Sequence, residues 1–295
     1  RLARESSIIC LSLWFAISVL LRVGRGKPCD RILSRALASA ARTAKAARMI
    51  ETRKILLLAG SLEARRVAEA LSAQAVLYDA WLSEAPRGAA LLPQVPQLRR
   101  FAQAGDFEQA VHACGYRAVL DAGHGFDRAA TRHAYLAART LGLPFLRLER
   151  PAWSLADRRH WRRAANAAQA CAMIGPGARV FCALGWDSLP DFAEFKGDVL
   201  KLRQTRRHAR AAPYAFVQMV FGDPPFSVAD EQKLFAELQI DTLVCRNIGG
   251  HASHSKLDAA AALGLEVIVV DRPAFPAGLP VVDNVQAALD WVAAL

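Results

Sequence analysis

Apolar runs that end in glycine or a polar residue recur along residues 54–295, and patterns with helical spacing separate them. The first run is KILLLAG (54–60), and residues 61–74 then place apolar side chains opposite a charged face. A continuous apolar run of this length is typical of a strand buried on both faces of a parallel sheet. The order of strand, tight turn and helix therefore predicts the start of a βαβ unit.

The same alternation continues to the C-terminus. Further strands are expected at residues 74–82, 116–123, 143–150, 177–185, 198–204, 214–222, 241–247 and 265–273. Further helices are expected at residues 106–115, 128–142, 162–175, 228–240, 253–264 and 284–295. Alternation in both halves predicts two doubly wound α/β domains, one at 49–153 and one at 176–295, joined by a connector at 154–175.

Residues 1–48 do not share this pattern. Their apolar run, residues 8–21, is 14 residues long, whereas a helix that spans a bilayer needs about 20. The chain begins with Arg1, and Met49 stands just before the first strand. A signal or anchor, or some other role, remains open. We expect an extension or leader that is not part of the fold.

The net charge of +11 is unevenly distributed. Residues 1–48 hold ten basic and two acidic residues, a net of +8, which leaves only +3 for the rest of the chain. A mildly basic body does not indicate nucleic-acid binding. None of the six cysteines forms a Cys-x-x-Cys pair, and His251 and His254 have no third ligand nearby, so no metal site is expected.

Ligands of open parallel sheets bind beyond the carboxyl ends of the strands. The loop after the first strand contains Gly60 and Ser61, where free N–H groups at the start of a helix can hold a phosphate. A second strand-end loop runs from Asp121 to Asp127. In it His124 and Asp121 are the catalytic candidates, and Asp127 is expected to cap the next helix.

Two further strand ends carry basic and glycine-rich sequence. The first contains Arg246, Asn247, Gly249 and Gly250, which is typical of an anion cradle. The second is a basic strip after the strand at 198–204, and its candidate substrate ligands are Arg203, Arg206 and Arg207. Such a strip is either a solvated surface or a site for a polycarboxylate substrate.

At these loops the sequence resembles the precorrin-6A reductase family of cobalamin biosynthesis. The similar segments run in order from residue 54 to 295, and any one of them is weak alone. They are LLLAGSLEA (56–64), AVLDAGHGFD (118–127), LRLERPAW (146–153), GARVFCALG (177–185), PPFSVADE (224–231), LVCRNIGG (243–250), KLDAAAALGL (256–265) and VIVVDRP (267–273).

The resemblance implies two Rossmann-like domains with a ligand cleft between them. It implies NADPH as hydride donor and a tetrapyrrole substrate, precorrin-6A or cobalt-precorrin-6A, one double bond of which is reduced to give precorrin-6B. Residues that would line the cleft are Gly60, Ser61, Asp121, His124, Asn247, Gly249 and Gly250. An enzyme that uses NADPH is expected in the cytoplasm, with no membrane association.

The departures from the family pattern fall in the cofactor loops. Ala59 stands where the family has a first glycine, Ser61 replaces threonine, and Ile248 replaces a serine. Gly123-His124-Gly125 replaces a Thr-His-Pro stretch, which loosens the loop. The alternative function is therefore a catalytically impaired paralogue that acts as a ligand-binding or assembly protein.

Overall fold

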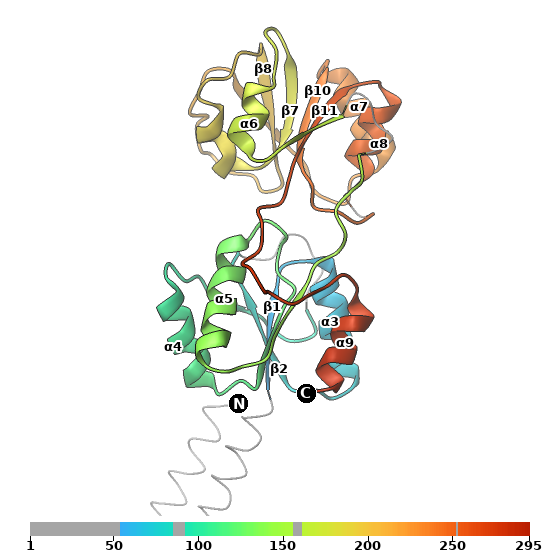
Figure 1. Ribbon diagram of the computed structural model, residues 1–295. Coiled ribbons are helices and arrows are strands. Elements are labelled where there is room, and N and C mark those ends of the chain that lie inside the picture. Colours follow the sequence, from blue (N-terminus) through green and yellow to red (C-terminus); the bar gives the residue numbers. More distant parts are fainter. Residues whose placement is uncertain (1–53, 85–91, 156–160, 252) are drawn as a thin grey trace, which may run out of the picture. The chain divides into compact units, whose positions relative to one another are not determined.

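The computed structural model describes residues 54–84, 92–155, 161–251 and 253–295 (Figure 1). The expectations for residues 1–48 therefore lie outside the described residues. The chain forms two parallel sheets of six strands each. Helices cover both faces of each sheet, so the predicted pair of doubly wound α/β domains is confirmed. None of the helices in the described ranges is long and apolar enough to cross a bilayer.

The first sheet has the strand order β3-β2-β1-β4-β5-β12. Its strands are β1 (Ile55–Ala59), β2 (Tyr78–Leu82), β3 (Gln97–Leu98), β4 (Ala118–Asp121), β5 (Phe145–Leu148) and β12 (Val281–Val282). Its helices are α3 (Leu62–Ala73), α4 (Ala104–Cys114), α5 (Arg128–Thr140) and α9 (Val285–Ala293). The order reverses direction between β1 and β4, so this is the Rossmann-type switch point at which ligands bind.

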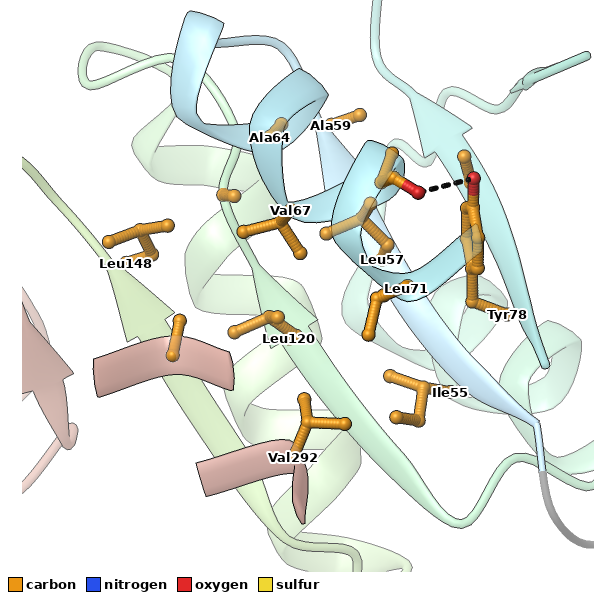
Figure 2. Close-up of a cluster of buried hydrophobic side chains, with 14 of the residues drawn as sticks. Ile55, Leu57, Ala59, Ala64, Val67, Leu71, Tyr78, Leu120, Leu148 and Val292 are labelled. Carbon is orange, nitrogen blue, oxygen red and sulfur yellow. Dashed lines mark hydrogen bonds between the residues drawn. The ribbon is translucent and has the colours of Figure 1, made fainter. Parts of the chain in front are cut away.

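Side chains of β1 alternate between two cores, as a pleated strand requires. Ile55 and Leu57 pack with α3 and α9, and Figure 2 shows Leu71 and Val292 of these helices on that face. Leu56 and Leu58 pack on the opposite face of the sheet, against α4 and α5. The all-apolar run is thus explained by burial on both sides.

The second sheet has the order β6-β11-β10-β7-β8-β9, with its reversal between β7 and β10. Its strands are β6 (Trp161–Ala164), β7 (Arg179–Ala183), β8 (Val199–Gln204), β9 (Val217–Phe221), β10 (Thr242–Arg246) and β11 (Glu266–Val270). One face packs on α6 (Ala167–Ala172) and the 3₁₀ helix η1 (Trp186–Phe192). The other packs on α7 (Val228–Glu237) and α8 (Ser255–Ala262).

Sheet membership differs from the predicted segment boundaries in two places. Residues 162–175, expected as one helix in the connector, begin with β6, which pairs with β11 of the second sheet. Near the C-terminus, β12 pairs with β5, and α9 packs on the first sheet. Residues 281–295 of the segment 176–295 thus complete the N-terminal sheet rather than the C-terminal one.

Candidate functional site

A cavity of about 970 Å³ is lined by the carboxyl ends of strands from both sheets. This volume lies at the upper end of the range for small-molecule sites, roughly 300–1,000 Å³. The lining includes Gly60, Ser61, Asp121 and His124 from the first sheet. From the second sheet it includes Arg203 and Arg246. Six of the predicted site residues therefore meet in one cavity.

The wall formed by the first sheet is built at its switch point. Gly60 lies so close to the neighbouring loop that a Cβ there would meet the backbone nitrogen of His124 at 2.9 Å. Ser61 is the N-cap of α3: its Oγ accepts from the N–H of Ala64 at 3.0 Å and donates to the carbonyl of Ala122 at 2.8 Å. Backbone, rather than side chain, therefore faces a ligand at Gly60.

Asp121 forms a buried ion pair. Its Oδ1 lies 2.6 Å from Nη1 of Arg147, and both side chains are almost fully buried. The same oxygen accepts from the N–H of Gly123 at 2.9 Å. Its Oδ2 is buried without a hydrogen-bond partner among the described residues, although Asp121 lines the cavity. A hydrogen-bond donor on a ligand would satisfy this oxygen.

His124 lies in the same loop, and its Nδ1 accepts from the N–H of Phe126 at 3.2 Å. Acceptance at Nδ1 leaves Nε2 as the protonated nitrogen of the neutral ring. Asp127 caps α5 through its Oδ1, which accepts from the N–H of Ala130, as the sequence predicted. His133 of α5 also lines the cavity.

The wall formed by the second sheet is cationic. Arg203 lies between the rings of Phe181 and Phe226, with Cζ 4.8 and 4.1 Å from the ring centroids. Its Nη2 lies 2.7 Å from Oε2 of the buried Glu231. Arg246 lies over the ring of Phe126 at 5.2 Å. Stacking and pairing hold these guanidinium groups in fixed positions on the wall.

Asn247, Gly249 and Gly250 do not line this cavity. The buried amide of Asn247 pairs with the backbone of Trp153, which donates at 2.8 Å and accepts at 3.2 Å. Both glycines have positive φ, and a Cβ on Gly249 would lie 2.1 Å from the carbonyl oxygen of Pro151. These residues pack against the chain segment that leaves β5. The anion cradle proposed for them stays a prediction.

Arg206 and Arg207 also lie outside the cavity lining. Both are exposed, and Arg207 lies over the ring of Phe221 at 5.6 Å. Of the three arginines predicted as substrate ligands, Arg203 is the one that lines the cavity.

A charged cluster surrounds Glu149, just after β5. Its carboxylate accepts from Arg128 at 2.8 and 3.1 Å and from Arg272 at 2.8 Å, and Nε of Arg147 lies 3.6 Å away. Burial alone would raise the pKa of Glu149, but these hydrogen bonds and positive charges outweigh it and lower that pKa. Arg272 follows β11, so the cluster ties the end of β5 to the second sheet.

Sequence reasoning missed several cationic residues of the cavity. Arg65 of α3, together with Arg99 and Arg100 after β3, lines it near the end of β2, where Nε of Arg100 donates to the carbonyl of Ser83 at 2.8 Å. Lys256 in the first turn of α8 lines it from the second sheet. Lys256 alone could have been suspected from the sequence. A cation in the first turn of a helix is disfavoured by the helix dipole, so its presence there indicates a role other than helix stability.

Within the described ranges, no group of three or more His, Cys, Asp or Glu side chains is arranged to hold a metal ion. Cys171, Cys182 and Cys245 are buried free thiols, and Cys114 is a partly buried one. Burial raises the pKa of Cys182 to about 12 and that of Cys245 to about 11, so both are neutral at pH 7.

Two doubly wound sheets, each with its switch point at one shared cavity, define a Rossmann-type α/β protein of the kind that binds nucleotide and substrate at strand ends. The family model described as "Precorrin-6x reductase CbiJ/CobK" matches residues 54–293. The chain therefore belongs to the precorrin-6x reductase family and is an oxidoreductase, which confirms the resemblance noted above.

Individual relatives agree with this assignment. A precorrin-6A reductase from Rhodococcus erythropolis is 35% identical over 247 residues, which cover 82% of this chain and 98% of the relative. One from Mycobacterium tuberculosis is 34% identical over 243 residues, with 82% and 98% covered. The solved structure titled "CobK precorrin-6A reductase" is similar with a TM-score of 0.74 and 28% identity, covering 82% of this chain and 96% of that one.

Proposed function

We propose that this protein reduces a carbon–carbon double bond of precorrin-6A, or of cobalt-precorrin-6A, to give the 6B form, with NADPH as the reductant. The observation that carries the proposal is the cavity at the two switch points. Its first wall offers backbone at Gly60 and has Arg65 and Arg100 beside it, whereas its second wall carries Arg203, Arg246 and Lys256. A ligand pair made of a dinucleotide and a polycarboxylate macrocycle fits such a division. Membership of the family supplies the reaction class.

The first wall fits the cofactor. Glycine at position 60 keeps the switch point clear for a phosphate, and the N–H groups at the start of α3 can bind it. Oδ2 of Asp121, which has no hydrogen-bond partner among the described residues, can accept a hydrogen bond from a hydroxyl or amide of the ligand. When bound, NADPH supplies the hydride, and the protein's part is to bind and orient it.

The choice of NADPH over NADH is supported by the end of β2. In Rossmann domains an acidic residue near this point binds the ribose hydroxyls of NADH, whereas arginine accommodates the 2′-phosphate of NADPH. Arg65 and Arg100 line the cavity, and Arg100 donates to the carbonyl of Ser83 just after β2, where Glu84 also lines the cavity. Their charges favour the additional phosphate.

The second wall fits the substrate. Precorrins carry several acetate and propionate carboxylates, and Arg203, Arg246 and Lys256 present positive charge to the cavity. The aromatic side chains Phe181 and Phe226 beside Arg203 add an apolar surface for a macrocycle. We place Arg206 and Arg207 at most at the outer rim of this site. The proposed location of the reaction is the cytoplasm.

The test is a binding and turnover assay with the purified protein. NADPH and NADH are titrated separately by fluorescence, and each is then mixed with precorrin-6A or cobalt-precorrin-6A under anaerobic conditions. The proposal expects tighter binding of NADPH and a product two mass units heavier than the substrate. NADPH binding without reduction of either macrocycle would instead identify the impaired paralogue, and absence of binding to both nucleotides would refute the cofactor assignment.

A further inference from the structure

Lys256 stands out on the wall formed by the second sheet. Its Nζ donates one hydrogen bond, to the carbonyl of Ser253, at 2.6 Å and lies 5.6 Å from the ring centroid of Trp153. No carboxylate of the described ranges forms an ion pair with it, whereas Arg203 on the same wall is paired with Glu231. Since an ammonium group has three N–H donors, two remain for the cavity that Lys256 lines.

The surroundings of Lys256 favour loss of its proton. Burial lowers its pKa, and the positive charge of Arg203 on β8 lowers it further, while Cys245 on β10 and Glu231 on α7 oppose the shift. Both opposing groups are weak, because the Cys245 thiol is neutral at pH 7 and the Glu231 carboxylate is taken up by Arg203. The position of Lys256 in the first turn of α8 acts in the same direction as burial.

Reduction of a carbon–carbon double bond needs a proton as well as a hydride. The hydride forms one new C–H bond, and a proton must form the second at the other carbon while the π bond breaks. Arginine cannot supply it, because its guanidinium does not lose a proton in proteins. The carboxylates of Asp121 and Glu231 are held in ion pairs with Arg147 and Arg203.

We propose that Lys256 is the proton donor to the macrocycle, an inference that rests on the reductase function proposed above. Its ammonium N–H bond breaks as the second C–H bond forms, which leaves a neutral amine that regains a proton from water. A lysine in this position also attracts the substrate carboxylates in its charged form, so one residue serves both orientation and chemistry. His124, on the opposite wall, is then not needed as an acid.

The deciding comparison is between Lys256→Arg and Lys256→Met. Arginine keeps the positive charge but cannot give up a proton, whereas methionine loses both. We expect both variants to slow single-turnover reduction by about 10²- to 10⁴-fold, the usual contribution of a general acid. Only Lys256→Met should weaken substrate binding strongly. The matched control is Lys233→Met on the exposed face of α7, where the rate should not change.

The pH dependence gives a second readout. The acid form of Lys256 is the active one, so the rate of the natural enzyme should fall as pH rises through the pKa of the bound complex. The Lys256→Arg variant should react slowly, and its rate should not show this fall at high pH. A Lys256→Arg variant that keeps most of the natural rate would overturn the proposal and leave Lys256 as a carboxylate ligand alone.

A measurement independent of turnover separates this proposal from the function it rests on. In protein labelled with [ε-¹³C]lysine, the signal lost in Lys256→Arg should titrate below the usual lysine pKa of about 10.4. A normal titration would contradict the proposal even if the enzyme reduces precorrin-6A. Failure of the natural protein to reduce either macrocycle would refute the proposed function, whatever the lysine titration shows.

Discussion

The two sheets share one topology, yet their strand ends present different chemistry to the cavity. At the first switch point, Gly60 leaves space and Ser61 closes hydrogen bonds within the fold, so backbone groups face the ligand. At the second sheet, Arg203 and Lys256 reach the cavity through long side chains. Backbone recognition suits a phosphate of fixed shape, whereas long cationic side chains suit carboxylates spread around a macrocycle.

The buried pair of Asp121 and Arg147 makes the first wall rigid, and its loss should have the largest effect. We expect Asp121→Ala to reduce the free energy of unfolding by about 3–5 kcal/mol, because it leaves the Arg147 guanidinium buried without a counter-ion. Urea denaturation measures this. In the exposed pair with Arg179, Asp198→Ala should cost less than about 1 kcal/mol. Equal losses in the two variants would mean that burial does not distinguish the pairs.

A substitution at Gly249 tests whether its loop serves in packing or in cofactor binding. A Cβ there would overlap the carbonyl of Pro151, and φ is +66°. We expect Gly249→Ala to lower stability by about 1–3 kcal/mol more than Gly264→Ala, which has φ of +68° but open space around it. NADPH affinity per folded molecule should be unchanged in both. A loss of affinity confined to Gly249→Ala would return this loop to the cofactor site.

Gly60→Ala should affect both stability and cofactor binding, because φ is +156° and a Cβ there would lie 2.9 Å from the backbone nitrogen of His124. The new methyl group would displace the loop of Gly123 and His124, which lines the cavity beside the proposed phosphate position. We expect NADPH affinity to fall by about 1–3 kcal/mol while substrate affinity is kept. Isothermal titration of each ligand separates the two walls. Unchanged NADPH affinity in a folded variant would remove the phosphate from this switch point.

The sequence predicted the central strands of both sheets, whereas it did not predict the short strand β12 or the packing of the glycine-rich loop. The long apolar runs predicted the central strands because burial on both faces leaves no other pattern. A two-residue strand such as β12 has no periodicity to detect, so its place in the first sheet was not predicted. The close contacts around Gly249 and Gly250 were not predicted either, because a glycine needed for close packing looks the same in sequence as one needed for a ligand.

Some residues of the candidate site could be predicted from the sequence and others could not. Gly60, Asp121 and Arg203 were predicted because they lie at the carboxyl ends of strands, and these ends converge in a parallel sheet. Lys256 and Arg65 lie within helices, and only folding brings them to the cavity. Their role therefore depends on contacts between residues far apart in the chain.

The cluster around Glu149 should make stability depend on acidity. Since its pKa is lowered in the folded state, its contribution is complete above the unfolded value of about 4.3 and is lost as pH falls through the folded pKa. We expect Glu149→Gln to lower stability at neutral pH and to weaken its fall between pH 5 and 3, roughly the window this linkage predicts. Thermal unfolding across this range measures it. An identical slope in the variant would assign the acid sensitivity to other carboxylates.

The smallest effect is expected at the rim of the second wall. Changing Arg206 and Arg207 together to Gln should raise KM only about two- to fivefold at low salt, and the difference should vanish at high salt because exposed charges are screened. NADPH affinity should stay constant. A KM that rises far more, and regardless of salt, would place these arginines inside the substrate site.

The return of β12 and α9 to the first sheet has a consequence for how the protein is made. On the ribosome, residues 54–148 emerge before the second sheet, but the strand that pairs with β5 and the helix that packs Ala288 and Val292 into that core emerge after it. The strands of the second sheet are all synthesised before them. The nascent chain can therefore complete its second sheet first, while the first sheet keeps one edge open until residues 281–295 have been synthesised.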